Sequence, residues 1–114
     1  MPYFDVKTTT SLNAETKENL YHELARIIEL VPGKSESWVM VNLADQAQMC
    51  FAGISAEPAA AVVLKTFGEL EGQYYDLLTK EICSRISPMI GVQPDRLYVT
   101  YEPITHWGWN GENF

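Results

Sequence analysis

The chain has 114 residues, 46% of them hydrophobic and 20% charged, and residues 1–114 are expected to form one globular domain with an apolar core. A formal net charge of −7 disfavours binding to nucleic acid or to an anionic membrane, and no cluster of Lys and Arg reverses this locally. Cys50 and Cys83 are too few for a disulfide framework, and no Cys/His spacing is typical of a metal site.

The first half of the chain predicts a strand, a helix and a second strand. Residues 3–9 alternate apolar and polar side chains, as in a strand with one buried face. An N-cap at Asn13 and apolar residues at helical spacing predict an amphipathic helix of about five turns. This helix should end at the valine, proline and glycine of residues 31–33. A second strand fits residues 38–43, and a short hairpin partner fits residues 48–51.

The second half repeats this order. Residues 59–67 are apolar almost throughout and predict a strand buried on both faces. Their periodicity also permits the start of a helix, but the flanking proline and glycine favour the strand. Residues 73–90 have helical periodicity with a proline that should distort the last turn, and residues 97–102 alternate like a strand. The tail, residues 106–114, is rich in aromatics and glycine and too apolar to extend into water.

Strand, helix and strand therefore occur twice, in residues 3–51 and 59–102. Each half predicts a βαβ unit whose helix crosses one face of the sheet. The expected fold is α+β, with a four-stranded mixed sheet and two helices on one face. Because the strand at 59–67 is too apolar for a bare opposite face, we expect further copies of the chain to cover it.

Pro2 follows the initiator methionine directly. If Met1 is removed, the ring nitrogen of Pro2 becomes a free secondary amine that can act as a base. Such an amine is normally protonated at neutral pH, but burial and a nearby positive charge both lower its pKa towards the working pH. If Met1 is retained, the nitrogen is an amide, and Pro2 merely stiffens the entry to a strand.

Five sequence features occur in one order with almost gap-free spacing, and together they span nearly the whole chain. They are the opening MP before an aromatic strand, GK at 33–34, MCFAGISAEPAA at 49–60, PDRLYV at 94–99 and the terminal GWNGENF. This pattern resembles the macrophage migration inhibitory factor branch of the tautomerase superfamily. The resemblance implies a homotrimer whose three sheets surround a central channel, with active sites at the subunit boundaries.

The resemblance also assigns the site. It implies that Pro2 is the catalytic base, that Lys34 and the backbone near 54–56 or 65–67 surround the pocket, and that a neighbouring subunit donates Tyr98 and Trp109. From the residues alone, Lys34 also suits a helix C-terminus, Tyr98 suits the core, and the tail tryptophans suit interface packing. The candidate substrate-binding residues are Lys34, Trp38, Phe67, Tyr98, Trp107, Trp109 and Phe114.

An aromatic α-keto acid suits such a site. Its carboxylate would pair with Lys34, its aryl group would pack among the aromatic side chains, and Pro2 would move a proton between carbon and oxygen. This is a keto–enol tautomerisation of the phenylpyruvate or dopachrome type, and it needs no metal and no organic cofactor. Decarboxylation or dehalogenation is less suited, because those branches recruit arginines to the substrate, whereas Arg26, Arg85 and Arg96 fall on the predicted helices or a turn. The alternative is a cytokine-like protein that binds a receptor and keeps a vestigial pocket.

Five positions depart from the family pattern, and one of them is Thr100, which replaces the family's usual asparagine two places beyond Tyr98 and changes the reach of a hydrogen-bonding group. Ala59 and Val62 replace a CxxC pair of the mammalian members, so their thiol oxidoreductase activity should be absent. Trp38 replaces a tyrosine and Phe67 an aliphatic residue, and these larger rings should narrow the site.

The chain shows neither a conventional secretory signal nor an apolar run long enough to cross a bilayer. We therefore expect a cytoplasmic protein, with secretion by an unconventional route left open.

Overall fold

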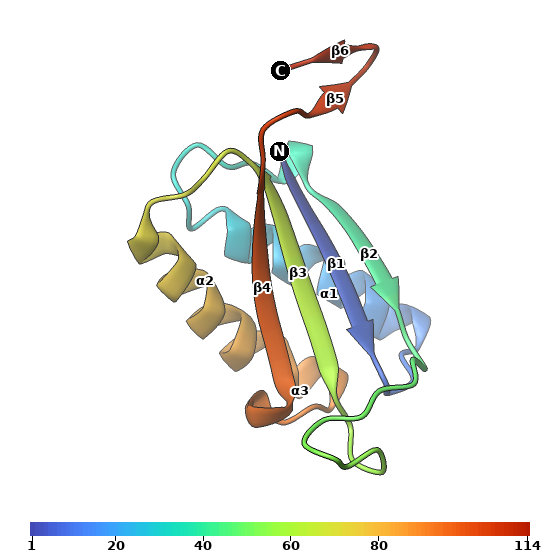
Figure 1. The fold of residues 1–114 in the computed structure, drawn as a ribbon. Helices are drawn as coiled ribbons and strands as arrows, with labels where there is room; N and C mark the ends of the chain where they lie inside the picture. Colours follow the sequence, from blue (N-terminus) through green and yellow to red (C-terminus); the bar gives the residue numbers. More distant parts are fainter.

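A four-stranded sheet carries two long helices on one face in the computed structural model, which describes residues 1–114 (Figure 1). The strand order is β2-β1-β3-β4. β1 pairs in parallel with β2, β3 pairs in parallel with β4, and the central pair β1–β3 is antiparallel. The predicted α+β class and mixed sheet are therefore confirmed. The strands are β1 (Pro2–Thr8), β2 (Met40–Ala44), β3 (Ala60–Phe67) and β4 (Leu97–Ile104).

Each parallel pair is joined by a helix. α1 (Ala14–Ile28) connects β1 to β2, and α2 (Gly72–Arg85) connects β3 to β4. Parallel neighbours need such a crossover, because a tight turn cannot bring the chain back in the same direction. Both helices lie on the same side of the sheet (Figure 1), so the two predicted βαβ units are confirmed. None of the helices is both long and apolar enough to span a lipid bilayer.

The start of α1 follows the predicted cap. Asn13 Oδ1 accepts a hydrogen bond from the Thr16 N–H group at 2.8 Å, which satisfies one free donor of the first turn. The helix is shorter than the predicted five turns and ends at Ile28. Beyond that point the Val31 N–H group bonds to the carbonyl of Ile28, three residues back, so the chain tightens before the turn.

The second strand begins later than predicted. Trp38, the expected first residue, ends a short 3-10 helix, η1 (Glu36–Trp38), and β2 starts at Met40. The Ser35 side chain accepts a hydrogen bond from the Ser37 N–H group at 3.3 Å, and the Ser35 carbonyl accepts one from the Trp38 N–H group. These local hydrogen bonds stabilise the 3-10 turn, so this segment does not form the strand that its alternating sequence predicts.

The predicted hairpin partner at residues 48–51 does not form. In its place Phe51 and Ile54 exchange two backbone hydrogen bonds, of 3.1 and 2.9 Å, across a tight turn. The two residues between them, Ala52 and Gly53, both have positive φ. The chain therefore reverses within this loop and adds no fifth strand to the sheet.

The predicted helix over residues 73–90 is divided. α2 ends at Arg85, and a separate short helix, α3 (Ser87–Ile90), follows. Pro88 has no N–H group for the helical ladder, so the distortion expected there becomes a break. Further along, a 3-10 turn, η2 (Pro94–Arg96), leads into β4, which extends to Ile104, two residues beyond its predicted end.

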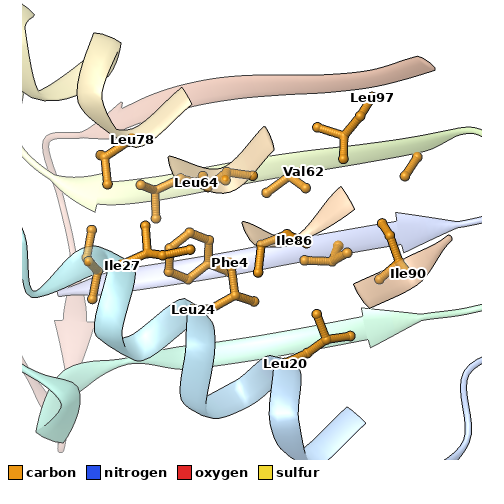
Figure 2. Close-up of a cluster of buried hydrophobic side chains, with 14 of the residues drawn as sticks. Phe4, Leu20, Leu24, Ile27, Val62, Leu64, Leu78, Ile86, Ile90 and Leu97 are labelled. Carbon is orange, nitrogen blue, oxygen red and sulfur yellow. The ribbon is translucent and has the colours of Figure 1, made fainter. Parts of the chain in front are cut away.

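The core fills the space between the helices and the sheet (Figure 2). Figure 2 shows Phe4 and Leu64 of the central strands pointing towards Leu24 of α1, and all three side chains are fully buried. Along β3 only alternate residues are buried, so the prediction that this strand is buried on both faces is wrong for the single chain. The helix-free face instead carries partly exposed Val63, and Tyr98 on β4 is 62% exposed.

Candidate active site

The N-terminal segment is held against the end of β3. Pro2 is buried and pairs with Thr66, and the Phe67 N–H group donates a hydrogen bond of 3.3 Å to the Met1 carbonyl. Met1 is present in this structure, so the nitrogen of Pro2 lies in a peptide bond and the terminal amine is that of Met1. Removal of Met1 would place the amine one residue deeper, at the buried start of β1.

The terminal amine lies in an environment that disfavours its charge. Burial lowers the pKa of the Met1 amino group, and the positive charge of Lys34 lowers it further. Burial also lowers the pKa of Lys34 itself. Gly33, with φ of +83°, and a 3.2 Å hydrogen bond from the Lys34 N–H group to the Val31 carbonyl form the turn that brings Lys34 here. Two cationic groups therefore lie at the same end of the sheet.

Four aromatic side chains form a cluster that we call the aromatic wall: Trp38, Phe67, Trp109 and Phe114. The ring centroids of Trp38 and Trp109 are 4.8 Å apart in an edge-to-face arrangement. Phe114 lies 5.8 Å from Phe67 and 6.3 Å from both tryptophans. Since the Phe67 N–H group bonds to Met1, this wall adjoins the N-terminus. The structure thus brings four of the predicted substrate-binding residues together.

A C-terminal hairpin carries two members of the wall. β5 (Gly108–Trp109) pairs with β6 (Glu112–Asn113) through a two-residue turn at 110–111, where both residues have positive φ. Asn-Gly is the sequence that this type of turn favours. The Phe114 N–H group then donates a 3.0 Å hydrogen bond to the Trp107 carbonyl. Figure 1 shows the hairpin and the N-terminus at the same end of the sheet.

Trp107 and Tyr98 lie apart from the wall. Trp107 lines a separate cavity of about 350 Å³ with Tyr3, Lys65 and His106. Tyr98 pairs with Ala61 near the start of β3. Since Pro2 pairs with Thr66, Tyr98 lies about 16 Å further along the sheet, at 3.3 Å for each of five residues. One chain therefore does not bring Tyr98 to Pro2.

Trp109 differs from the expectation drawn from the resemblance. It was expected to reach the pocket from a neighbouring subunit, but it contacts Trp38 of its own chain. The tight turn at 110–111 folds the tail back, so Trp109 needs no second subunit to join the wall. Of the two aromatic residues expected from a neighbour, only Tyr98 is left remote from its own N-terminus.

Arg96 is a residue whose environment sequence reasoning missed, since it was assigned to a turn and given no role. Its side chain is buried and donates hydrogen bonds to four backbone carbonyl groups. The one available signal was its place in the PDRLYV segment, next to the strand that carries Tyr98.

Comparisons with known proteins agree with this architecture. The family model "Macrophage migration inhibitory factor (MIF)" matches residues 1–114. The chain is 29% identical to the factor of Rattus norvegicus and 28% identical to that of Meriones unguiculatus, and each alignment covers 100% of this chain and 99% of the relative. Among solved structures, MIF2 of Leishmania major is 32% identical with a TM-score of 0.93, covering 100% of this chain and 97% of that one.

The homologue from Prochlorococcus marinus is 28% identical with a TM-score of 0.81, and the alignment covers 98% of both chains. The match is continuous from the N-terminal proline segment to the C-terminal hairpin, so it includes both parts of the chain that meet at the candidate site. The chain belongs to the macrophage migration inhibitory factor family.

Proposed function

We propose that the protein is a cofactor-free keto–enol tautomerase of aromatic α-keto acids such as phenylpyruvate, with Pro2 as the general base after removal of Met1. The observation that carries the proposal is the meeting of three features at one end of the sheet. These are a terminal amine whose pKa is lowered by burial and by Lys34, the cation of Lys34, and the aromatic wall. They match the base, the carboxylate partner and the aryl site that the reaction needs.

The proposed reaction is a proton transfer within the substrate. The carboxylate pairs with Lys34 and the aryl ring packs against the aromatic wall, which holds the carbon next to the carbonyl near the Pro2 nitrogen. The neutral amine takes a proton from that carbon, which leaves an enolate, and the enolate oxygen then receives a proton from the protonated amine to give the enol and the neutral amine. No electron is gained or lost overall. The reverse sequence converts the enol to the keto acid.

A homotrimer completes the proposed site. Tyr98 is 62% exposed and remote from its own Pro2, and Met40 of β2 is 63% exposed. Both residues suit burial against another copy of the chain. In the trimer Tyr98 of one subunit would reach the site of the next, as the family resemblance implies. Light scattering should give three times the chain mass of 12.9 kDa, and a stable monomer would contradict this assembly.

The test of catalysis asks whether turnover depends on a free amine at Pro2 or only on the presence of the proline ring. Intact-mass measurement should show loss of one methionine, and phenylpyruvate tautomerisation should be visible as absorbance of the enol–borate complex. Pro2→Gly should lose turnover by about 10²-fold or more. A matched variant with one glycine inserted between Met1 and Pro2 keeps the ring but converts its nitrogen to an amide, and it should lose turnover equally. Full activity of the inserted variant would refute Pro2 as the base.

A receptor-binding role is the second candidate, and the observation that favours it is the name of the curated relatives, which describes an effect on macrophage migration. This role makes a distinct prediction. If receptor binding is the function and the pocket is vestigial, Pro2→Gly should leave the biological response unchanged. If catalysis is the function, the same substitution should abolish it while the oligomer stays intact.

A further inference from the structure

Arg96 anchors the loop at residues 51–58. Its side chain is only 8% exposed, and every hydrogen bond from this loop to the rest of the chain is donated by its guanidinium. The ion pair with Glu57 is weak, because the atoms are 3.8 Å apart and that carboxylate side chain is 62% exposed. The accepting carbonyls and distances are Pro58 at 2.8 Å, Ile54 at 3.0 Å, and Phe51 and Glu57 at 3.2 Å.

The loop contacts Tyr98 through the ring of Phe51. The guanidinium carbon of Arg96 lies 5.3 Å from the ring centroid of Phe51, and the Phe51 ring lies 5.2 Å from that of Tyr98 at an interplanar angle of 86°. This edge-to-face geometry is a favoured one for aromatic pairs. Arg96 precedes Tyr98 by two residues, so the same turn that starts β4 also fixes the ring against which Tyr98 packs.

We propose that Arg96 is a positioning residue for the active site of the neighbouring subunit. It holds Phe51, Phe51 orients Tyr98, and Tyr98 completes the adjacent site; the inference rests on the proposed tautomerase and its trimer. Only a guanidinium supplies enough fixed donors for four carbonyls, because a lysine ammonium has three donors on a flexible stem. The loop itself has few other restraints, since the Phe51–Ile54 hydrogen bonds lie within it.

Two variants test the link at different points. Arg96→Lys releases the loop, and Phe51→Leu keeps a side chain of similar size but removes the ring that faces Tyr98. Each should raise KM for phenylpyruvate by about 2- to 10-fold, the range for one aromatic pair, and leave the acidic limb of the pH–rate profile in place. Phe51→Tyr is the control that keeps the ring, and its KM should equal that of the wild type. Light scattering should show that the oligomer is retained in all three.

Mixed oligomers separate positioning from damage to the chain's own fold. When equal amounts of Arg96→Lys and Pro2→Gly chains are refolded together and assayed at substrate concentrations below KM, about one quarter of the sites combine an intact Pro2 with a neighbour that keeps Arg96. Activity should therefore exceed the average of the two separate variants. Activity equal to that average would overturn the inference, because the Arg96 defect would then act within its own chain.

Two further outcomes distinguish this inference from the function on which it rests. If the wild type tautomerises phenylpyruvate through Pro2 but Arg96→Lys and Phe51→Leu have wild-type KM, the positioning role is refuted and the proposed function stands. If the wild type shows no turnover dependent on Pro2, both proposals are refuted. A raised KM in Arg96→Lys and Phe51→Leu, a wild-type KM in Phe51→Tyr and a gain of activity in mixed oligomers support both proposals.

Discussion

Replacing Phe114 by alanine removes one ring from the aromatic wall and leaves the backbone hydrogen bond from residue 114 to the Trp107 carbonyl available. The lost contacts are with Phe67 at 5.8 Å and with Trp38 and Trp109 at 6.3 Å. Three aromatic pairs are worth about 1.5–4.5 kcal/mol together at 0.5–1.5 kcal/mol each. Because the ring is 52% exposed and two of the pairs are at long range, the lower limit of about 1.5 kcal/mol applies.

This free energy is lost from the packing of the free chain and should appear as lower stability of the hairpin. An aryl substrate loses one ring as a neighbour, a pair worth about 0.5–1.5 kcal/mol, so KM for phenylpyruvate should rise by about 2- to 10-fold in Phe114→Ala, with a smaller change in kcat. Initial rates from the enol–borate absorbance measure both constants. Glu112→Ala is the matched control for a change in this hairpin, because Glu112 is exposed, pairs with Trp109 and contributes no aromatic ring of its own. A KM within twofold of the wild type in Phe114→Ala would refute the assignment of the wall to substrate binding.

Three further predictions follow from the described contacts. Burial is the main cause of the lowered pKa of the terminal amine, and the positive charge of Lys34 is the second cause. Lys34→Met removes that charge, so the pKa of the amine should rise and the acidic limb of the pH–rate profile should move to higher pH. An unmoved limb would show that Lys34 does not act on the base. Leu64→Ala removes a fully buried side chain and should cost about 3–5 kcal/mol in the free energy of unfolding, whereas Val63→Ala on the helix-free face of the isolated chain should cost less, as urea titration would report. The Leu12 N–H group donates a 2.9 Å hydrogen bond to Asp45, and this bond is the main cause of the lowered pKa of that carboxyl. The stability that the bond gives is complete above the ordinary carboxyl pKa and is lost as the pH falls through the lower pKa of the folded state. The free energy of unfolding of Asp45→Asn should therefore depend less on pH in the acidic range.

The order of the elements could be predicted because periodicity is a local property of the sequence. The helical spacing of Leu20, Leu24 and Ile27 and the alternation in residues 3–9 each reflect one buried face, and the structure buries those faces. The limits of the elements depend on competition between nearby groups. Trp38 stands in an alternating segment, yet the Ser35 side chain and carbonyl hold it in a 3-10 turn. Alternation alone does not report such a cap.

The site was harder to predict where it depends on contacts between distant segments. The assignment of Lys34 to the N-terminus came from the family resemblance, and the pKa of the Met1 amine now gives it a physical basis. Trp107 and Trp109 are two residues apart in an aromatic tail, and only the hairpin turn decides which one joins the wall. Arg96 was predicted only as part of a turn, because its hydrogen-bond partners lie 38–45 residues earlier in the chain.

The sheet register links the core to the proposed chemistry. Side chains of a strand alternate between its two faces, and Pro2 belongs to the same row of β1 as Phe4 and Val6, which are fully buried under the helices. A slip of one residue between β1 and β3 would move this whole row to the helix-free face. The pairing of Pro2 with Thr66 therefore does two things at once. It buries Phe4 in the core, and it keeps the residue that would carry the base in a buried position, where desolvation lowers the pKa of an amine.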